Sequence, residues 1–200
     1  DTTNHRIGVL PRYRHDDAVN GHAMILVRHA RPLIASGVCY GVLDVPADAQ
    51  STQQAAEELA KNLPQGAVVW HSTLQRCKQL TYALQGLRAD LIAKPDARLR
   101  EMDFGTWEGK CWDDIPRAEL EAWTDSFFTY RCGGGDNVET FMARIAQAWD
   151  ECHAKPSPHV WITHAGVIRT ALLLAQGKRS IHRADEWPRV EVGFGEWLAT

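Results

Sequence analysis

The chain has 200 residues, 44% hydrophobic and 24% charged, with a formal net charge of −3 at pH 7. This length and composition are typical of one soluble globular domain with a sizeable core. The small negative charge gives no overall field that favours nucleic acid or an anionic membrane surface, and no apolar run approaches the roughly 20 residues of a membrane span. Any anion must therefore be recognised locally.

The cysteines argue against a disulfide framework. They are odd in number, widely spaced and without a Cys-x-x-Cys pair: Cys39, Cys77, Cys111, Cys132 and Cys152. We expect reduced, buried, small hydrophobic side chains and a cytoplasmic protein.

Residues 1–22 show neither helical nor strand periodicity and mix arginines with proline and glycine. This composition predicts an N-terminal tail or arm. An arm could cover part of a partner subunit, which leaves a homodimer open as an alternative to a monomer. Residues 23–200 are predicted to form a single domain.

From residue 24 onward, predicted strands and helices alternate. We expect strands over 24–28, 67–70, 90–93, 160–163 and within 190–198. We expect helices over 50–63, 74–87, 115–130, 138–152 and 167–176. This alternation predicts an α/β protein, a three-layer α/β/α sandwich around a mainly parallel central sheet. Residues 103–137, rich in glycine, tryptophan and acid at their start, are predicted to form a lid-like insertion within the domain.

An arginine and a histidine follow the first predicted strand directly. The apolar run 24–27 is typical of a buried parallel strand, and it leads into Arg28 and His29. Ligands of open α/β sheets bind outside the carboxyl ends of the strands. A fixed positive charge beside an imidazole at that position favours an anion, and a phosphate above others, next to a group that attacks it or moves its proton.

Two other predicted strands also end at histidines, His71 and His164. Arg76 follows His71 by five residues, and Ala165 follows His164 where a helix is predicted to begin. The N–H groups at a helix start favour an anion. Because the carboxyl ends of parallel strands share one rim, we expect these residues to converge.

Three histidines could instead hold a metal ion. Arg28 and Arg76 would, however, place fixed positive charges beside a dication, and the chain has no His-Glu-x-x-His or His-x-His motif. We therefore expect no metal and no cofactor, because guanidinium groups suit a phosphoryl group well.

Phosphoryl transfer without a metal needs a nucleophile, cationic clamps and a proton donor. His29 is the candidate nucleophile and Glu101 the candidate acid, with Asp103 and Glu108 as alternatives. Each residue alone has an ordinary explanation, such as a core histidine or an ion pair of Glu101 with Arg98 or Arg100. The hypothesis depends on their combination.

Four motifs occur in one order: Arg28-His29-Ala30, Ser72-Thr-Leu-Gln-Arg76, Leu99-Arg-Glu101-Met-Asp-Phe-Gly105-Thr-Trp-Glu-Gly109, and His164-Ala165-Gly166. Over nearly all of residues 24–198 the chain resembles the histidine phosphatase superfamily, also called phosphoglycerate mutase-like. That resemblance implies the phosphoglycerate mutase-like fold and a phosphohistidine intermediate on His29. It also implies Glu101 as proton donor and then base, with Arg28, Arg76, His164 and the adjoining Ala165 around the phosphoryl group.

The chain departs from the family pattern at Ala30, where glycine is commoner, at Ala35, where many members have asparagine, and at His71, where serine is frequent. The segment 39–46 resembles alpha-ribazole phosphatase-like members, which favours a small phosphorylated metabolite, such as alpha-ribazole phosphate, as the substrate. The acid segment lacks the mutase pattern Glu-Arg-x-Tyr-Gly and so favours hydrolysis. Mutase-type phosphoryl transfer and a non-catalytic phospho-ligand binding module are the alternatives. Candidate specificity residues are Arg31, Tyr40, His71 and the segment 105–137.

Overall fold

The computed structural model describes residues 24–156 and 158–200, so the predicted tail at 1–22, and the homodimer hypothesis based on it, lie outside the described residues. The strands are β1 (Met24–Arg28), β2 (Val68–His71), β3 (Ile92–Pro95), β4 (His159–Thr163) and β5 (Trp197–Ala199). The helices are α1 (Ala49–Asn62), α2 (Gln75–Leu87), α3 (Arg117–Asp125), α4 (Val138–His153) and α5 (Ala165–Ala175).

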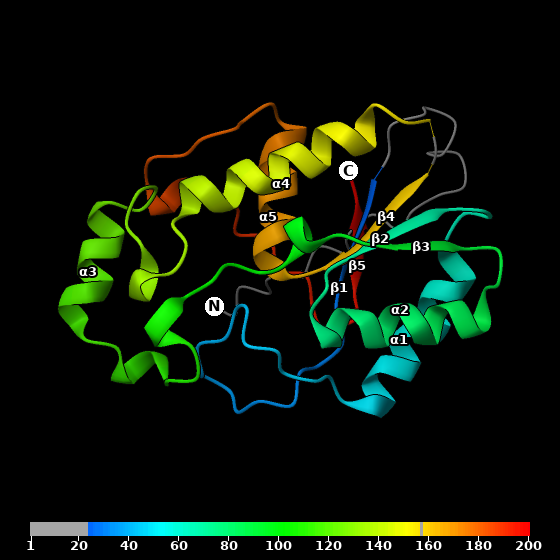
Figure 1. The fold of residues 1–200 in the computed structure, drawn as a ribbon, viewed down its shortest axis with the longest axis horizontal. Coiled ribbons are helices and arrows are strands. Elements are labelled where there is room, and N and C mark those ends of the chain that lie inside the picture. The colour runs from blue at the N-terminus through cyan, green and yellow to red at the C-terminus, as the bar shows by residue number, and fades with distance from the viewer. Residues whose placement is uncertain (1–23, 157) are drawn as a thin grey trace, which may run out of the picture.

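The strands form one sheet in the order β3-β2-β4-β1-β5. The pairs β1–β4, β2–β4 and β2–β3 are parallel, and β5 adds to β1 as an antiparallel edge. Figure 1 shows α1 and α2 on one face of the sheet and α4 and α5 on the other. The predicted α/β class and three-layer sandwich are confirmed.

Alternate residues of β1 pack into two cores on opposite faces of the sheet. Met24 and Leu26 belong to the core that includes Phe141 of α4. Ile25 and Val27 belong to the core against α1 and α2. Burial on both faces explains why this strand is a continuous apolar run rather than an alternating one.

Two elements are shorter than predicted. The helix expected over 115–130 is α3, Arg117–Asp125, because the backbone leaves the helical region at Ser126 and a turn closes with Tyr130 N–H donating to the Ser126 carbonyl. The last strand is three residues long, because residues 190–196 form a loop. In this loop the Gly195 amide donates hydrogen bonds to the carbonyls of Arg28 and His29.

The segment 103–137 leaves the sheet layers and lies to one side of them (Figure 1). The backbone around Gly105 packs closely against the backbone around Gly133. Both glycines have positive φ, and a Cβ on Gly105 would collide with the Gly133 carbonyl, as one on Gly133 would with the Phe104 carbonyl. Its aromatic side chains join the core on the α4 and α5 side. Its lid-like role stays a prediction.

The five cysteines are all free thiols. Cys39, Cys77, Cys132 and Cys152 are buried, as predicted for small core side chains, whereas Cys111 is exposed. Cys111 is exposed because it follows the loop 105–110 on the surface of the 103–137 segment, outside both cores.

Candidate active site

The strand register brings His29 and His164 together. Arg28 pairs with Thr163 across β1 and β4, so the next residues leave the sheet side by side. The two imidazole rings lie 5.2 Å apart between centroids, and both side chains are buried. The predicted convergence of these strand ends at one rim is therefore present in the fold.

The tautomer of His29 follows from one contact. Its Nδ1 lies 2.7 Å from the carbonyl oxygen of Ala30. A carbonyl oxygen only accepts hydrogen bonds, so in the neutral ring Nδ1 carries the hydrogen and Nε2 keeps a lone pair. Burial, and then the charge of Arg76, lower the pKa of His29 to about 3. At neutral pH the ring is therefore a neutral base with Nε2 available to attack.

His164 is held by a different set of contacts. Its Nε2 lies 2.8 Å from Ser72 Oγ, and its Nδ1 is buried without a hydrogen-bond partner among the described residues. A serine hydroxyl can donate or accept; when that of Ser72 donates to Nε2, Nδ1 carries the hydrogen and is left as a donor. Burial, and then the charge of Arg76, lower the pKa of His164 well below its usual value, so this ring too is neutral at pH 7.

Arg28 extends over the rim beside the histidines. Its Nη1 donates to the carbonyl of Val192 at 2.9 Å, and its guanidinium lies 4.0 Å from the ring centroid of Phe194. Phe194 also contacts the His29 ring, at 5.7 Å between centroids. The loop before β5 therefore covers part of the site.

Arg76 is fully buried, and its guanidinium both binds a neighbouring loop and lies near the histidines. Nη1 and Nη2 donate to the carbonyls of Leu43 and Gly41, at 2.9 and 2.6 Å. Its Nε is buried with no partner among the described residues. Arg76 thus holds the loop 41–43 in place and brings its charge close enough to depress the pKa of both histidines.

Glu101 meets the site through the start of α5. Its Oε2 accepts a hydrogen bond of 3.0 Å from the Gly166 amide, and its Oε1 accepts one of 3.1 Å from its neighbour Met102. The ion pairs considered for Glu101 do not form: Arg98 pairs with Asp96 and Glu151, and Arg100 donates to the Ala97 carbonyl. The carboxylate therefore binds the amide two residues after His164, and no cationic side chain of residues 24–156 and 158–200 forms an ion pair with it.

The two alternative acids serve the backbone. Glu108 accepts hydrogen bonds from the amides of Gly41, Val42, Leu43 and Phe104, at 2.9 to 3.1 Å. Asp103 accepts from the Gly105 amide at 2.8 Å, where the chain turns. Glu108 therefore fixes the 41–43 loop and Asp103 fixes a turn, which leaves Glu101 as the candidate acid.

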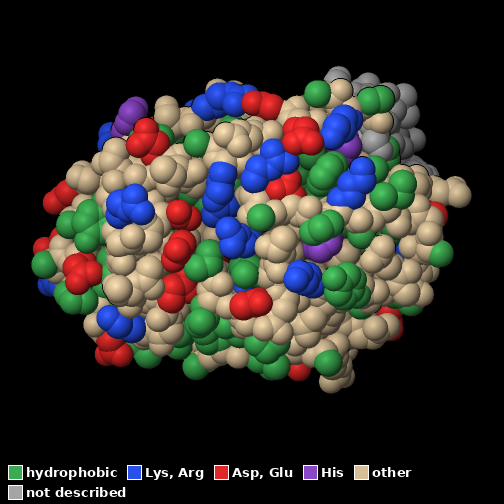
Figure 2. Space-filling model, viewed as in Figure 1, with side chains coloured by type: hydrophobic (Ala, Val, Ile, Leu, Met, Phe, Trp, Pro, Cys, Tyr) green, Lys and Arg blue, Asp and Glu red, His purple; other side chains and the backbone are tan. Residues whose placement is uncertain are grey.

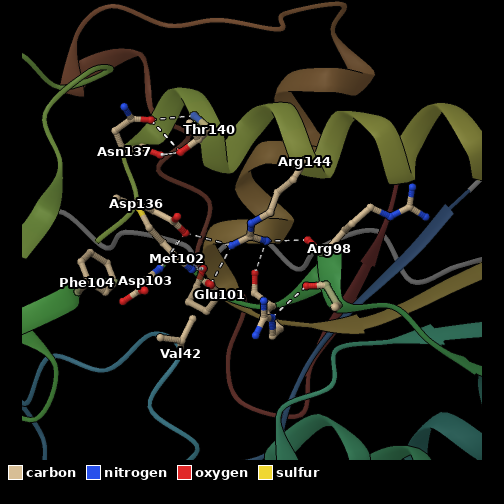
Figure 3. Close-up of polar contacts among 12 residues, drawn as sticks. Val42, Arg98, Glu101, Met102, Asp103, Phe104, Asp136, Asn137, Thr140 and Arg144 are labelled. Carbon is tan, nitrogen blue, oxygen red and sulfur yellow. Dashed lines mark hydrogen bonds and ion pairs between the residues drawn. The ribbon is translucent and has the colours of Figure 1, made fainter. Parts of the chain in front are cut away.

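Arg144 of α4 holds the segment that carries Glu101 (Figure 3). Its Nη1 donates to the carbonyls of Arg98 and Arg100 at 2.6 and 2.7 Å, and its Nη2 donates to the carbonyl of Glu101 at 2.9 Å. Asp136 lies 3.4 Å from the same guanidinium and accepts from the Asp103 amide. One side chain thus positions three carbonyls within the four residues 98–101.

The candidate specificity residues differ in whether they contact the residues of the site. The Tyr40 ring lies 5.2 Å from the Arg76 guanidinium, and its hydroxyl is hydrogen-bonded to Arg28, so it bridges the two arginines. Arg31 is exposed, pairs with Asp48 at 3.5 Å and lines a surface hollow together with Phe194. His71 is buried against Tyr82 of α2, and no contact joins it to His29 or His164.

Four contributors were not predicted: Ser72 as partner of His164, Phe194, Arg144 and Arg169. Arg169 lies on α5 one turn after Gly166, and its charge, after burial, is among the smaller causes that lower the pKa of Arg28. The helical spacing i, i+3 is the one sequence signal that could have found it. Phe194 and Arg144 come to the site from distant parts of the chain, and no local sequence pattern predicts their roles. The Ser72 contact spans 92 residues.

Ala30 and Ala165 fit their places without strain. Neither has positive φ, and Ala30 is fully buried beneath His29. Ala165 begins α5, but the next amide, that of Gly166, is engaged by Glu101. Within the described residues no group of three or more His, Cys, Asp or Glu side chains is arranged to hold a metal ion.

The outer surface agrees with the small net charge. Figure 2 shows Lys and Arg side chains interspersed with Asp and Glu over the face drawn. Over residues 24–156 and 158–200, none of the helices has the length and apolarity to cross a membrane.

Comparison with known proteins gives the same picture. Residues 24–190 match the histidine phosphatase superfamily (branch 1). No curated protein matches the sequence. A mycobacterial glucosyl-3-phosphoglycerate phosphatase has a similar structure, with 23% identity over 89% of each chain and a TM-score of 0.72. A protein of Thermus thermophilus is 25% identical over 89% of this chain and 92% of its own, with a TM-score of 0.67.

An α/β fold with two neutral histidines, a buried and a half-buried arginine, and a carboxylate at the strand ends is suited to handling a phosphate. The chain belongs to the histidine phosphatase superfamily. The phosphoglycerate mutase-like fold and the phosphatase class predicted from the motifs are confirmed.

Proposed function

We propose that this protein is a metal-independent phosphomonoester hydrolase that acts through a phosphohistidine at His29. The observation that carries the proposal is the 2.7 Å contact of His29 Nδ1 with the Ala30 carbonyl, because it leaves the Nε2 lone pair as the only nucleophilic position of a neutral ring. The charges of the buried Arg76 and the half-buried Arg28 supply the stabilisation that a phosphoryl group needs.

In the first step, His29 Nε2 forms a bond to phosphorus while the bond from phosphorus to the ester oxygen breaks. Glu101, protonated at the start, gives its proton to the departing alcohol oxygen. Arg28, Arg76 and the N–H of His164 Nδ1 stabilise the charge on the three remaining phosphoryl oxygens. The first product is the alcohol, and the phosphoryl group stays on His29.

In the second step, the Glu101 carboxylate takes a proton from water as the water oxygen bonds to phosphorus and the phosphorus–nitrogen bond breaks. Inorganic phosphate leaves, His29 is neutral again and Glu101 is protonated for the next cycle. The two steps sum to hydrolysis of the ester by one water molecule, with no metal ion required.

The substrate is proposed to be a small phosphorylated metabolite in the cytoplasm, a location supported by the five free thiols. Alpha-ribazole phosphate is the first compound to test, on the resemblance of the segment 39–46. Glucosyl-3-phosphoglycerate is the second, on the structural likeness. Much of the 39–46 segment is bound by Glu108 and Arg76, which gives it a scaffolding role alongside any contact with substrate.

The test is phosphate release from both compounds and from a panel of phosphorylated metabolites, with and without chelator. We expect hydrolysis that chelator leaves unchanged. Loss of activity on chelation and its return with a dication would overturn the metal-free mechanism. Transfer of phosphate between substrate positions without release would indicate a mutase, and binding without turnover would indicate a phospho-ligand binding module.

A further inference from the structure

A pocket of about 270 Å³ adjoins the candidate acid. Glu101, Gly166 and Arg169 contribute its polar side, and most of the remaining lining is aromatic or aliphatic. Since Glu101 and Gly166 are hydrogen-bonded to each other, the pocket begins where the candidate proton donor meets α5. The described reaction of the phosphoryl group does not use the rest of this pocket.

The aromatic side chains that line the pocket form one connected cluster of rings. Trp112 and Trp123 stack with their planes 14° apart, and Trp123 and Phe127 stack at 17°, with ring centroids 6.4 and 5.5 Å apart. Trp187 meets Phe127 edge to face. Flat aromatic surfaces of this kind favour a flat ring as ligand, through offset stacking and burial of apolar area.

The size of the pocket limits the ligand. A cavity of roughly 150 Å³ accommodates benzene, and pockets for drug-sized molecules begin at roughly 300 Å³. A volume of about 270 Å³ therefore fits one ring with a small substituent. Larger groups would extend out of it.

Arg169 supplies a charge with no counterion. In the part of the chain that the structure describes, no carboxylate pairs with it and no oxygen accepts a hydrogen bond from it, whereas Arg98, Arg144 and Arg179 all have carboxylate partners. Its side chain is half-buried at the pocket. The pKa of Arg28 is lowered mainly by burial and, among smaller contributions, by the charge of Arg169, so the two arginines lie close enough to repel.

The charges of the site do not balance without a further anion. Arg28 and Arg76 match the two negative charges of a phosphate dianion. His29 and His164 are neutral, and in the proposed first step Glu101 enters as the proton donor and so adds no negative charge. With substrate bound, Arg169 is the cation that remains unmatched beside this pocket.

We propose that this pocket binds the alcohol part of the substrate, a single flat ring bearing a second anionic group that Arg169 recognises. The inference rests on the proposed function, and it names the substrate class of the same site. The ring lies against Trp112, Trp123 and Trp187, the ester oxygen lies at Glu101, and the second anion lies at Arg169. A carboxylate and a second phosphate both satisfy this chemistry.

The test compares esters that share one leaving-group chemistry. Ethyl phosphate has no ring, benzyl phosphate has the ring alone, 4-carboxybenzyl phosphate adds a carboxylate, and the bisphosphate of 1,4-benzenedimethanol adds a phosphate. We expect kcat/KM to rise from ethyl to benzyl phosphate, and again by about tenfold or more with one of the two anions. The better of the two anions identifies the natural group.

Three variants assign the effects. Arg169→Met should abolish the preference of the wild type for the anionic ester over benzyl phosphate, and Arg169→Lys should restore part of it. Trp187→Ala should lower the preference for benzyl over ethyl phosphate. Lys178→Met is the matched control, because it removes an exposed cation just beyond the other end of α5, and it should leave both ratios unchanged.

A binding measurement separates this inference from the proposed function. Tryptophan fluorescence should report 4-carboxybenzyl phosphonate, which cannot be hydrolysed, binding about tenfold more tightly than benzyl phosphonate in the wild type and equally in Arg169→Met. Hydrolysis with no preference among the esters, or an anion preference that survives Arg169→Met, overturns the inference and leaves the proposed function standing. Selective phosphonate binding without hydrolysis of any ester overturns the proposed function instead.

Discussion

The amide of Gly166 donates a hydrogen bond of 3.0 Å to Glu101 Oε2, and the space above Gly166 is filled by that carboxylate. A Cβ at position 166 would collide with Glu101 Oε1. The glycine has ordinary negative φ, so the side chain is excluded by this contact and not by the backbone conformation. One residue of the fourth motif therefore sets the position of the acid in the third.

Gly166→Ala should reduce turnover while the fold persists. The added methyl must push the carboxylate aside, and a displacement of about 1 Å can cost about 10²-fold in rate. The free energy of unfolding should change by less than about 1 kcal/mol, because the displaced group is the end of a flexible side chain and alanine is a good helix former. Steady-state kinetics and urea unfolding check this, with Gly86→Ala as control, since its methyl would meet nothing within 4 Å.

Glu101→Gln should lower kcat by about 10²–10⁴-fold, the usual contribution of general acid–base catalysis. Glu108→Gln is the comparison, because Glu108 accepts four amide hydrogen bonds from the backbone. It should instead lower the free energy of unfolding by about 1–3 kcal/mol, through weakened bonds to a charged acceptor. If Glu108→Gln lost more turnover than Glu101→Gln at equal stability, the acid would have to be reassigned.

Arg144→Met should act through the position of Glu101. Three carbonyls, those of Arg98, Arg100 and Glu101, lose their donor (Figure 3). We expect kcat to fall while KM changes little, with about 1–3 kcal/mol lost from the free energy of unfolding. Arg98→Met removes a more exposed arginine nearby that pairs with Asp96 and Glu151, and it should leave kcat unchanged. Equal effects of the two variants on kcat would contradict a positioning role.

Acidification should destabilise the protein through its buried histidines. Burial, then the charge of Arg76, lower the pKa of His29 to about 3 in the folded state, so below the unfolded value of about 6.5 the unfolded chain binds the extra proton. The contribution of His29 to the free energy of unfolding is then full above about pH 6.5 and decreases as the pH is lowered. At pH 5 it is smaller by about 2 kcal/mol.

Urea unfolding of the wild type and of His29→Asn at about pH 7.5 and about pH 5 measures this effect. The variant should lose about 2 kcal/mol less than the wild type between the two pH values. The exposed His182 is the control position. A wild-type loss that His29→Asn does not reduce would place the titration elsewhere.

The sheet and much of the site could be predicted because both depend on local pattern. The apolar run before Arg28 and His29 requires a buried strand, and parallel pairing with the strand before His164 requires the two histidines to meet. The end of α3 and the shortness of β5 were not predictable, because turn contacts at Ser126 and Gly195 decide them.

The roles of the acids and arginines depend on contacts between distant parts of the chain. Glu101 and Glu108 lie in the same motif, and only the fold shows that Glu108 binds the 41–43 loop. The motif places Arg76 at the site, but its two carbonyl contacts are 33 and 35 residues away. The helical spacing could place Arg169 near the site, but only the fold shows that it lines the pocket without a carboxylate partner among the described residues.

The most direct test of a phosphohistidine at His29 is to trap it. Enzyme mixed with an activated aryl phosphate and denatured in alkali, where a phosphoryl–imidazole bond survives, is analysed by intact and peptide mass spectrometry. We expect one added phosphoryl group on His29, none in His29→Ala, and a larger fraction in Glu101→Gln, where hydrolysis of the intermediate is slowed. An equal phosphoryl load in His29→Ala, or a load carried by another residue, would contradict the account.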